Sequence, residues 1–346
     1  MDIVYASDDG YAHVLAASII SLMDNNKDTD GLQIHILDCG LREESKKKIT
    51  QMCRSYGVST EYVHVGNISK NINIDMNMQR WPQSALARLF MPSLLHNLDK
   101  VLYLDCDTVI CGSLSELWET DLNGYHAAMV SDGHNGYLRK QMGISPDGEY
   151  FNSGMILASL ERWRQSGIEK QFIEFIVSQN GYVQFADQPV INAVLDGRIR
   201  ALSLKYNVTM QYFIYTYKEF IRVKNPTCFV SEEDYREAVM SPVIIHYTGS
   251  IRVRGRPWLI GNNCPKENIF RHYYSMTLWG DEPFKPYKPT MTQRIYGGFS
   301  RLAPRLVMIW ISYIGYIAIL PMIYTIKRIR AGLRTNQKIR NKKDTA

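Results

Sequence analysis

The most constraining feature of this 346-residue chain is a short apolar run that ends in two acids. Residues 101–104 (Val-Leu-Tyr-Leu) have the composition of a buried strand, and Asp105 and Asp107 follow it. In extended backbone, side chains two positions apart point to the same side, so the two carboxylates should lie together. Carboxylates that meet at the end of a buried strand repel each other unless a cation lies between them. The stretch predicts either a divalent metal site or a solvated Asp-x-Asp loop.

The first 250 residues predict strands that alternate with helices. Expected strands cover residues 3–6, 32–37, 60–65, 101–104, 127–130, 151–157 and, within 241–249, a last strand that ends at His246. Expected helices follow Tyr11 and cover residues 43–53, 81–95 and 114–118. This alternation indicates an α/β fold with a parallel central sheet and right-handed crossovers. Such sheets bind ligands beyond the carboxyl ends of their strands. The sequence places these acids there: Asp8, Asp9, Asp105, Asp107 and Asp132.

Two common nucleotide-binding motifs are absent from the sequence. No GxGxxG follows the first strand and no GxxxxGK[ST] occurs anywhere, which disfavours dinucleotide-dependent oxidoreductases and P-loop NTPases. The six cysteines form no CxxC pair or regular framework, and the chain opens on a strand-like segment rather than a signal peptide. We therefore expect reduced cysteines in a cytoplasmic compartment. The length allows one large domain or two smaller ones.

Several polar residues each have two readings. Arg88, among apolar neighbours, is either a structural ion-pair partner or a group that reaches a substrate. Asn152 and Gly154 open a buried run, and they indicate either close approach of a ligand to the backbone or a strand bulge. Asp187 is by default a helix N-cap. His246 ends a strand, where a structural role and a third metal ligand are both open.

As an ordered set, these motifs resemble glycosyltransferase family 8, and within it the bacterial lipopolysaccharide galactosyl- and glucosyltransferases. The matching motifs are residues 3–9, 102–107, 151–154, 187–188 and 246–249. The resemblance implies a GT-A nucleotide-diphosphosugar transferase fold, Rossmann-like with a mostly parallel central sheet. It also implies a UDP-hexose donor, Mn(II) as cofactor with Mg(II) as a second candidate, and retention of anomeric configuration.

The resemblance also assigns roles to residues by their place in each motif. The metal ligands it implies are Asp105, Asp107 and His246. The residues it implies for binding the nucleotide and donor sugar are Ala6, Asp8, Arg88, Asp105, Asn152, Gly154, Gly249 and Arg256, the last in place of a family lysine at the diphosphate. The residues it implies beside the reacting carbon are Asp132, Asp187 and Gln188.

The expected chemistry is consistent with these residue types. Two carboxylates and one imidazole suit Mn(II) better than Mg(II), which prefers oxygen ligands. Retention can follow from a double displacement through a protein nucleophile or from a front-face reaction. Because UDP itself can accept the acceptor's proton, we expect the front-face reaction, in which Asp187 and Gln188 position and polarise the substrates rather than form an adduct. The alternatives are a metal-dependent phosphohydrolase that uses the same aspartates and a non-catalytic membrane scaffold that binds sugar nucleotides.

The last 56 residues differ in composition from the rest. Residues 291–346 contain eleven Lys or Arg and one Asp, a net charge of +10; because the whole chain carries +6, residues 1–290 carry −4. Within them, residues 306–326 contain no charged residue, which is long enough to span a bilayer. Basic flanks on both sides, several Tyr and Trp, and Pro321 favour a monotopic or re-entrant anchor over a span or a soluble packed helix.

The sequence therefore divides into a catalytic domain, residues 1–290, and a membrane-association tail, residues 291–346. We expect the protein at the cytoplasmic face of the inner or plasma membrane, peripheral or monotopic. Its expected partners are a UDP-sugar, a glycolipid or oligosaccharide acceptor and an anionic membrane surface, and not nucleic acid. The sequence does not give the oligomeric state.

Overall fold

A computed structural model describes residues 1–66, 83–179, 183, 186–249 and 255–344. Its centre is a seven-stranded sheet in the order β3-β2-β1-β4-β7-β6-β8. The strands are β1 (Asp2–Ser7), β2 (Gln33–Asp38), β3 (Ser59–His64), β4 (Lys100–Leu104), β6 (Ala127–Ser131), β7 (Phe151–Ser159) and β8 (Ile199–Leu202). The first four neighbours run parallel, β7 runs antiparallel to β4 and β6, and β8 is parallel to β6. The expected α/β fold with a mostly parallel sheet is confirmed.

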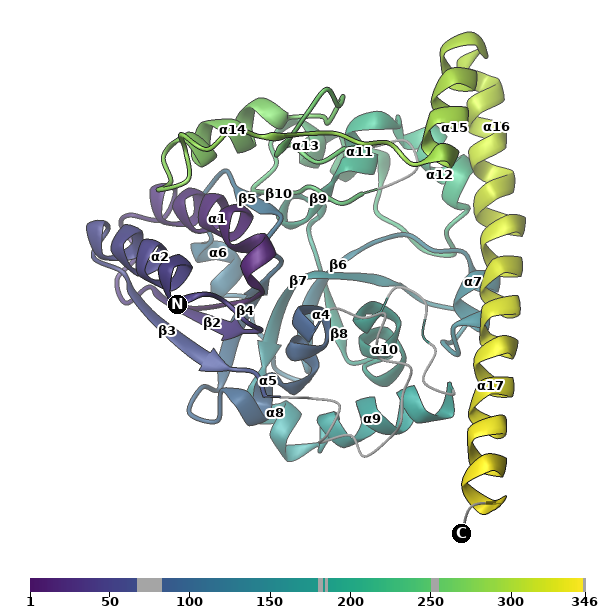
Figure 1. Cartoon of the computed structure of the whole chain (residues 1–346), viewed down its shortest axis with the longest axis horizontal. Helices are drawn as coiled ribbons and strands as arrows, with labels where there is room; N and C mark the ends of the chain where they lie inside the picture. The colour runs from purple at the N-terminus through teal and green to yellow at the C-terminus, as the bar shows by residue number, and fades with distance from the viewer. Residues whose placement is uncertain (67–82, 180–182, 184–185, 250–254, 345–346) are drawn as a thin grey trace.

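Both faces of this sheet are covered, because the side chains of its strands alternate between two apolar cores. Ile3 and Leu102 belong to one core, and their neighbours Val4 and Val101 belong to the other; all four are fully buried. Complete burial of such a side chain contributes about 1.5–3 kcal/mol. One core includes α1 (Ala12–Asp24) and α2 (Glu43–Ser55), and the other includes α8 (Leu160–Gln165), α9 (Ile168–Ser178) and α10 (Asp187–Val194) (Figure 1).

A second, three-stranded sheet brings distant segments to the carboxyl end of β4. It consists of β5 (Thr108–Ile110), β10 (Ile244–His246) and β9 (Val208–Thr209), in the order β5-β10-β9. β5 begins just after Asp107 and pairs antiparallel with β10, which sets His246 opposite Thr108. The strand expected within residues 241–249 thus exists as β10, and it lies in this sheet rather than in the central one.

The helix expected over residues 81–95 is instead three short turns. These are α4 (Gln83–Ala87), the 3-10 turn η3 (Arg88–Phe90) and α5 (Met91–Leu94), while residues 81 and 82 lie outside the described residues. Pro92 explains the break, because it has no backbone N–H to bond the carbonyl of Arg88 and its ring crowds that carbonyl. The break leaves Arg88 buried in a tight turn rather than on a continuous helix face.

Shorter elements connect the sheets and helices. They are η1 (Asp9–Tyr11), α6 (Ser115–Trp118), α7 (Gly136–Gln141), η4 (Leu204–Tyr206), α11 (Met210–Ile214), α12 (Tyr217–Lys224), α13 (Glu232–Met240), β11 (Leu259–Ile260), α14 (Glu267–Ser275) and β12 (Lys285–Pro286). Helices expected after Tyr11 and over residues 43–53 and 114–118 are present as α1, α2 and α6.

The C-terminal segment forms a hairpin of helices whose second arm runs along one side of the molecule (Figure 1). α15 (Met291–Leu302) precedes α16 (Arg305–Ile314), a five-residue π-helical turn η5 (Gly315–Ile319) and α17 (Leu320–Asp344). The wider π turn comes directly before Pro321, whose ring would clash with a carbonyl four residues earlier in an α-helix. The proline therefore changes the helical winding without ending the helix.

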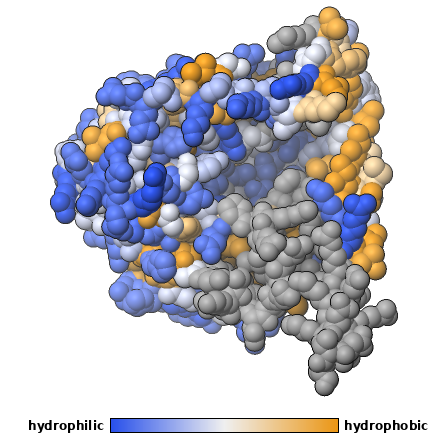
Figure 2. All heavy atoms as spheres, in the orientation of Figure 1, coloured by the Kyte–Doolittle hydropathy of each residue, from blue (hydrophilic) through white to orange (hydrophobic). Residues whose placement is uncertain are grey.

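One side of this helix packs against the body, and the other side exposes apolar residues (Figure 2). Met308, Ile309 and Tyr324 are buried, and Arg305 forms an ion pair with Glu219. The exposed apolar residues are Leu306, Val307, Trp310, Ile311, Ile314, Ile319, Met322, Ile323, Ile326, Ile329 and Leu333. Among the described residues, Arg305–Arg330 is a helix long and apolar enough to cross a membrane, with mean hydropathy 2.1 over its most apolar window.

Candidate active site

The two acids of the Asp-x-Asp stretch and His246 come together at the carboxyl end of β4. Nε2 of His246 lies 3.2 Å from Oδ1 of Asp107 and 3.5 Å from Oδ2 of Asp105. One ligand atom from each residue lies within 4.8 Å of the other two. The turn between β4 and β5 keeps both acids on one side, since the backbone N–H of Thr108 donates to the Asp105 carbonyl at 3.1 Å. Among the described residues, this is the one His, Cys and acid cluster spaced to hold a metal ion.

Each carboxylate has one oxygen held by a cation and the other directed toward His246. Arg88 Nη2 donates to Asp105 Oδ1 at 2.7 Å, and Tyr103 Oη donates to the same oxygen at 3.1 Å. Arg256 Nη1 donates to Asp107 Oδ2 at 2.7 Å. Asp105 Oδ2, Asp107 Oδ1 and His246 Nε2 are therefore the three atoms left to share a ligand.

An amide network fixes which nitrogen of His246 faces the carboxylates. Nδ1 of His246 lies 3.0 Å from Oδ1 of Asn207. Nδ2 of Asn207 donates to Oδ1 of Asn152 at 2.9 Å, and this oxygen also accepts the backbone N–H of Gly154 at 2.9 Å. Because Asn207 presents its oxygen to Nδ1, that nitrogen carries the proton and the lone pair of Nε2 can bind a cation.

Gly154 is required by space at this point. A Cβ at position 154 would lie 2.1 Å from Cε1 of His246 and 2.9 Å from Oδ2 of Asp105. The residue lies where the pairing of β7 with β6 shifts, since Met129 pairs with Ile156 and Val130 with Asn152. The bulge, one of the two readings left open by the sequence, is therefore present, and its glycine permits contact between the strand backbone and the acid–imidazole cluster.

The charges of the cluster match the requirements of a bound cation. Burial alone raises the pKa of Asp107, but its interactions with His246 and Arg256 outweigh burial and hold this pKa below its ordinary value. Burial alone lowers the pKa of His246, and Asp107 and Asp105 reverse that effect and raise it. Two carboxylate oxygens and one oriented imidazole suit a transition-metal dication better than a dication that binds oxygen ligands alone.

Arg88 lies between the acid–imidazole cluster and Asp187, and forms ion pairs with both Asp105 and Asp187. Its Nη1 lies 3.3 Å from Asp187 Oδ2 and donates to the Ser153 carbonyl at 2.8 Å, and its guanidinium lies 4.4 Å from the centre of the Tyr103 ring. The expectation that Asp187 caps a helix is wrong. α10 begins at Asp187, and its N-cap is Ala186, which has a φ of 56° and makes no capping hydrogen bond.

The Asp187 carboxylate does not cap α10, because it is buried and forms an ion pair with Arg88. Burial is the main influence on Asp187 and raises its pKa, an effect that the charge of Arg88 opposes. Both readings of Arg88 left open by the sequence are thus compatible with its position: it forms buried ion pairs and lies between two acids of the candidate site.

Gln188 and Asp132 form a third group beside Ser153. Gln188 Nε2 donates to Asp132 Oδ2 at 3.0 Å, and Gln188 Oε1 accepts the Ser153 backbone N–H at 3.3 Å. His134 Nε2 lies 3.3 Å from the same Asp132 oxygen. Burial alone raises the pKa of Asp132, but nearby Lys224 and His134 lower it to about 2. Asp132 therefore remains ionised and fixes the Gln188 amide.

The residues expected at the nucleotide side lie where β1 and β10 end. Asp8 Oδ1 accepts the Tyr11 backbone N–H at 3.2 Å and so caps η1. The Ala6 carbonyl accepts the Cys106 thiol at 3.2 Å. A Cβ at Gly249 would lie 3.5 Å from the Arg256 guanidinium, so this glycine is adjacent to the cation. The five residues before Gly255 lie outside the described residues.

Not every strand-end acid faces the site. Asp9 binds Arg42 Nε at 2.5 Å and Ser45 Oγ at 2.7 Å, and thereby joins η1 to the start of α2. Four residues that hold the site's side chains in place were not predicted from the sequence: Asn207, Ser153, Tyr103 and His134. Asn207 and His134 lie outside the matched motifs, and Ser153 acts through its backbone, which carries no signal of residue type.

Comparisons with known proteins found a matching family model and several relatives. The family model described as glycosyl transferase family 8 matches residues 2–259. General stress protein A of Bacillus subtilis strain 168 is 26% identical over 283 residues, which cover 81% of this chain and 94% of that protein. Lipopolysaccharide 1,2-glucosyltransferase of Escherichia coli K12 is 26% identical over 287 residues, which cover 82% of this chain and 80% of that enzyme.

A solved structure shows the same architecture. The galactosyltransferase LgtC, in complex with donor and acceptor sugar analogues, superposes with a TM-score of 0.67 at 25% identity, over 80% of this chain and 96% of LgtC. The expected GT-A fold is thus confirmed. Since the family model covers most of the chain and the acid–imidazole site lies within it, this protein belongs to glycosyl transferase family 8.

Proposed function

We propose that this glycosyltransferase moves galactose or glucose from a UDP-sugar to a glycolipid or surface-glycan acceptor, with Mn(II) and with retention of anomeric configuration. The observation that carries the proposal is the convergence of Asp105 Oδ2, Asp107 Oδ1 and His246 Nε2, each fixed by a partner on its other side. A bound Mn(II) would act as a Lewis acid on the diphosphate and neutralise the charge of the departing UDP.

The chain's own groups complete the diphosphate side. Arg256 binds Asp107 and lies next to Gly249, and we propose that its guanidinium also binds phosphate oxygens of the donor. The rings of Tyr11 and Trp258 pack edge to face with their centres 5.9 Å apart. We propose that these rings provide an aromatic surface for the nucleotide base. Ala6 and Asp8, at the end of β1, are proposed as the remaining nucleotide contacts.

The positions of Asp187 and Gln188, across from the metal ligands, support a front-face reaction. Asp187 is held by Arg88, and Gln188 is held by Asp132 and the Ser153 backbone, so neither side chain is free to swing onto the anomeric carbon. We propose that both side chains, together with Asn152, orient the hexose and stabilise the positive charge that develops on its anomeric carbon. UDP takes the acceptor's proton. The names of the relatives, a glucosyltransferase and a galactosyltransferase, make UDP-glucose and UDP-galactose the first donors to test.

We also propose that residues 291–346 hold the enzyme at the cytoplasmic membrane face as a monotopic anchor, while residues 1–290 form the catalytic domain. The helix contacts the body at Arg305, Tyr316 and Arg328, over about 35 Å at 1.5 Å per residue. A spanning orientation would bring the polar body alongside the hydrocarbon core, which is about 30 Å thick. A helix that lies in the interface exposes its apolar face to lipid and keeps the body in water.

The decisive experiment is a screen of UDP-sugars against the full chain with Mn(II), Mg(II) or chelator, read as UDP release and as product anomer. We expect release with UDP-galactose or UDP-glucose that requires the metal. Asp107→Asn should reduce it at least 100-fold, because a bound cation loses a charged ligand, whereas the control Asp121→Asn at an exposed turn should not. Inorganic phosphate as the product would instead indicate a phosphohydrolase, and donor binding without turnover would indicate a scaffold.

A further inference from the structure

The tail contributes a side chain to the neighbourhood of the sugar pocket. Tyr316, in the π turn η5, forms a hydrogen bond through its hydroxyl with Nδ1 of His134. The two rings are stacked, with centres 5.6 Å apart and planes at 24°. Lys224 Nζ lies 4.7 Å from the centre of the Tyr316 ring, a cation–π distance. The helix with the exposed apolar face therefore reaches the segment that follows β6.

His134 connects this contact to the groups proposed to hold the hexose. It is 5% exposed, and its Nε2 lies 3.3 Å from Oδ2 of Asp132, the oxygen that accepts the Gln188 amide. Burial lowers the pKa of His134 to about 4, so the ring is neutral near pH 7 and carries one N–H. If the Tyr316 hydroxyl donates to Nδ1, the proton of His134 lies on Nε2 and donates to Asp132.

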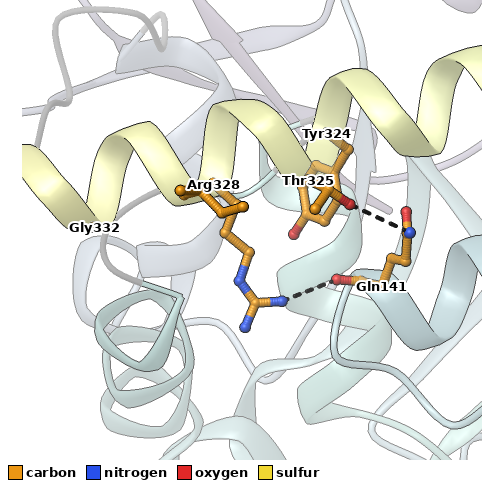
Figure 3. Close-up of a pocket in the computed structure, with 6 residues that line it drawn as sticks. Gln141, Tyr324, Thr325, Arg328 and Gly332 are labelled. Carbon is orange, nitrogen blue, oxygen red and sulfur yellow. Dashed lines mark hydrogen bonds between the residues drawn. The ribbon is translucent and has the colours of Figure 1, made fainter.

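Neighbouring contacts hold the tail helix in this register. Tyr324, about two turns farther along, is 1% exposed and packs with Leu138, Met142, Ile144 and Tyr150. In Figure 3, Thr325 and Arg328 of α17 lie against Gln141 of α7, with Gln141 Nε2 to Thr325 Oγ1 at 3.4 Å and Arg328 Nη1 to the Gln141 carbonyl at 3.3 Å. α7 begins two residues after His134, so these contacts also stabilise the His134 backbone.

We propose that Tyr316 is a positioning residue for the donor-sugar pocket: through His134 and Asp132 it fixes the orientation of the Gln188 amide. The membrane-facing helix is then part of the catalytic unit and not only its anchor. This inference rests on the proposed function, because it takes the Asp132–Gln188 pair as the side of the site that binds the hexose.

The test compares Tyr316→Phe with the unchanged full chain, in binding and in turnover. Calorimetry with Mn(II) should show UDP-hexose bound about tenfold more weakly, because a buried imidazole nitrogen loses its donor and the Gln188 amide is less restrained. UDP alone should bind within twofold, since the metal cluster and Arg256 are untouched. The kcat/KM for the hexose donor should fall by about tenfold.

Two controls separate a positioning role from a general loss of structure. Tyr313→Phe removes a hydroxyl three residues away on the same helix, where the ring contacts Trp310, and should leave both affinities unchanged. Equal weakening of UDP and UDP-hexose in Tyr316→Phe, or no change in either, would overturn the inference. Absence of UDP release from the unchanged chain with any donor would instead refute the proposed function.

Discussion

At the scale of single residues, the candidate site depends on a position that has no side chain. Gly154 lies in the bulge of β7, where its backbone N–H bonds Asn152 and its missing Cβ leaves space for His246. Any larger residue would compete with the imidazole for that space. The close approach explains why a strand this deeply buried contains a glycine that weakens it.

Gly154→Ala should therefore impair metal binding more than stability. The new methyl group would displace His246, so we expect Mn(II) affinity to fall about 10–100-fold, the range for loss of ligand orientation. Titration of the metal by electron paramagnetic resonance, with thermal unfolding measured in parallel, checks this. Gly298→Ala is a matched control, because a Cβ there meets nothing within 4 Å. Unchanged Mn(II) affinity in Gly154→Ala would contradict the assigned geometry.

The sequence identifies the charged residues of the site better than the neutral ones that orient them. Asp105, Asp107 and His246 belong to motifs, and the structure brings all three together as expected. Asn207 belongs to none, and it reaches His246 because β9 pairs with β10 in a separate sheet. A contact across 39 residues is a property of strand register, which local sequence does not specify.

At the scale of elements, sequence pattern predicts the strands well and the arrangement of helices less well. All seven expected strands are present, because continuous apolar runs between turn residues are a strong signal. The expected helix before β4 is broken, because Pro92 acts against an otherwise helical composition. The expected cap at Asp187 is absent, because a buried ion pair with Arg88 outweighs the local preference.

The junction of α12 with α16 should depend on pH. Both carboxylate oxygens of Glu219 bind Arg305, at 2.6 and 2.7 Å. The hydrogen bond from Arg305 is the main reason that the pKa of Glu219 falls to about 2. A lowered pKa stabilises the folded state above the unfolded-state pKa of about 4.3, and this contribution disappears as pH falls through 2.

Glu219→Gln should therefore cost about 1 kcal/mol of unfolding free energy at pH 7. The difference between variant and unchanged chain should shrink below pH 4 and vanish near pH 2. Urea unfolding of both proteins at a series of pH values measures it. Glu174→Gln is the control, because its carboxylate lies 3.8 Å from Lys170 on an exposed surface. A difference that stays constant from pH 7 to pH 2 would refute the ion-pair account.

At the scale of the whole molecule, the tail gives the protein one strongly apolar side. The exposed residues of α16 and α17 form this surface in Figure 2, and Trp310 and Ile314 lie one turn apart on it. Each apolar side chain transferred from water contributes about 1.5–3 kcal/mol, and basic residues near an anionic surface add about 1 kcal/mol each. These contributions support the proposal that this surface binds anionic bilayers.

The double variant Trp310→Glu, Ile314→Glu should reduce binding to anionic phospholipid vesicles at least 100-fold. It loses two apolar groups and gains two charges that the surface repels. Co-sedimentation measures the partition, and UDP-sugar hydrolysis in solution should be unchanged because neither side chain contacts the site. Met240→Glu changes an even more exposed apolar residue, on α13, and should bind vesicles like the unchanged chain. Normal sedimentation of the double variant would exclude this helix face as the attachment surface.

The long contact between the tail helix and the body has a consequence for how acceptors are found. A helix attached loosely to its domain would let the domain tumble above the lipid, whereas this one is fixed to it at three separated points. On a bilayer, the main motions left to the enzyme would be lateral diffusion and rotation about the membrane normal. The opening of the site would then stay at a constant height, and the search for a lipid-linked acceptor would be two-dimensional.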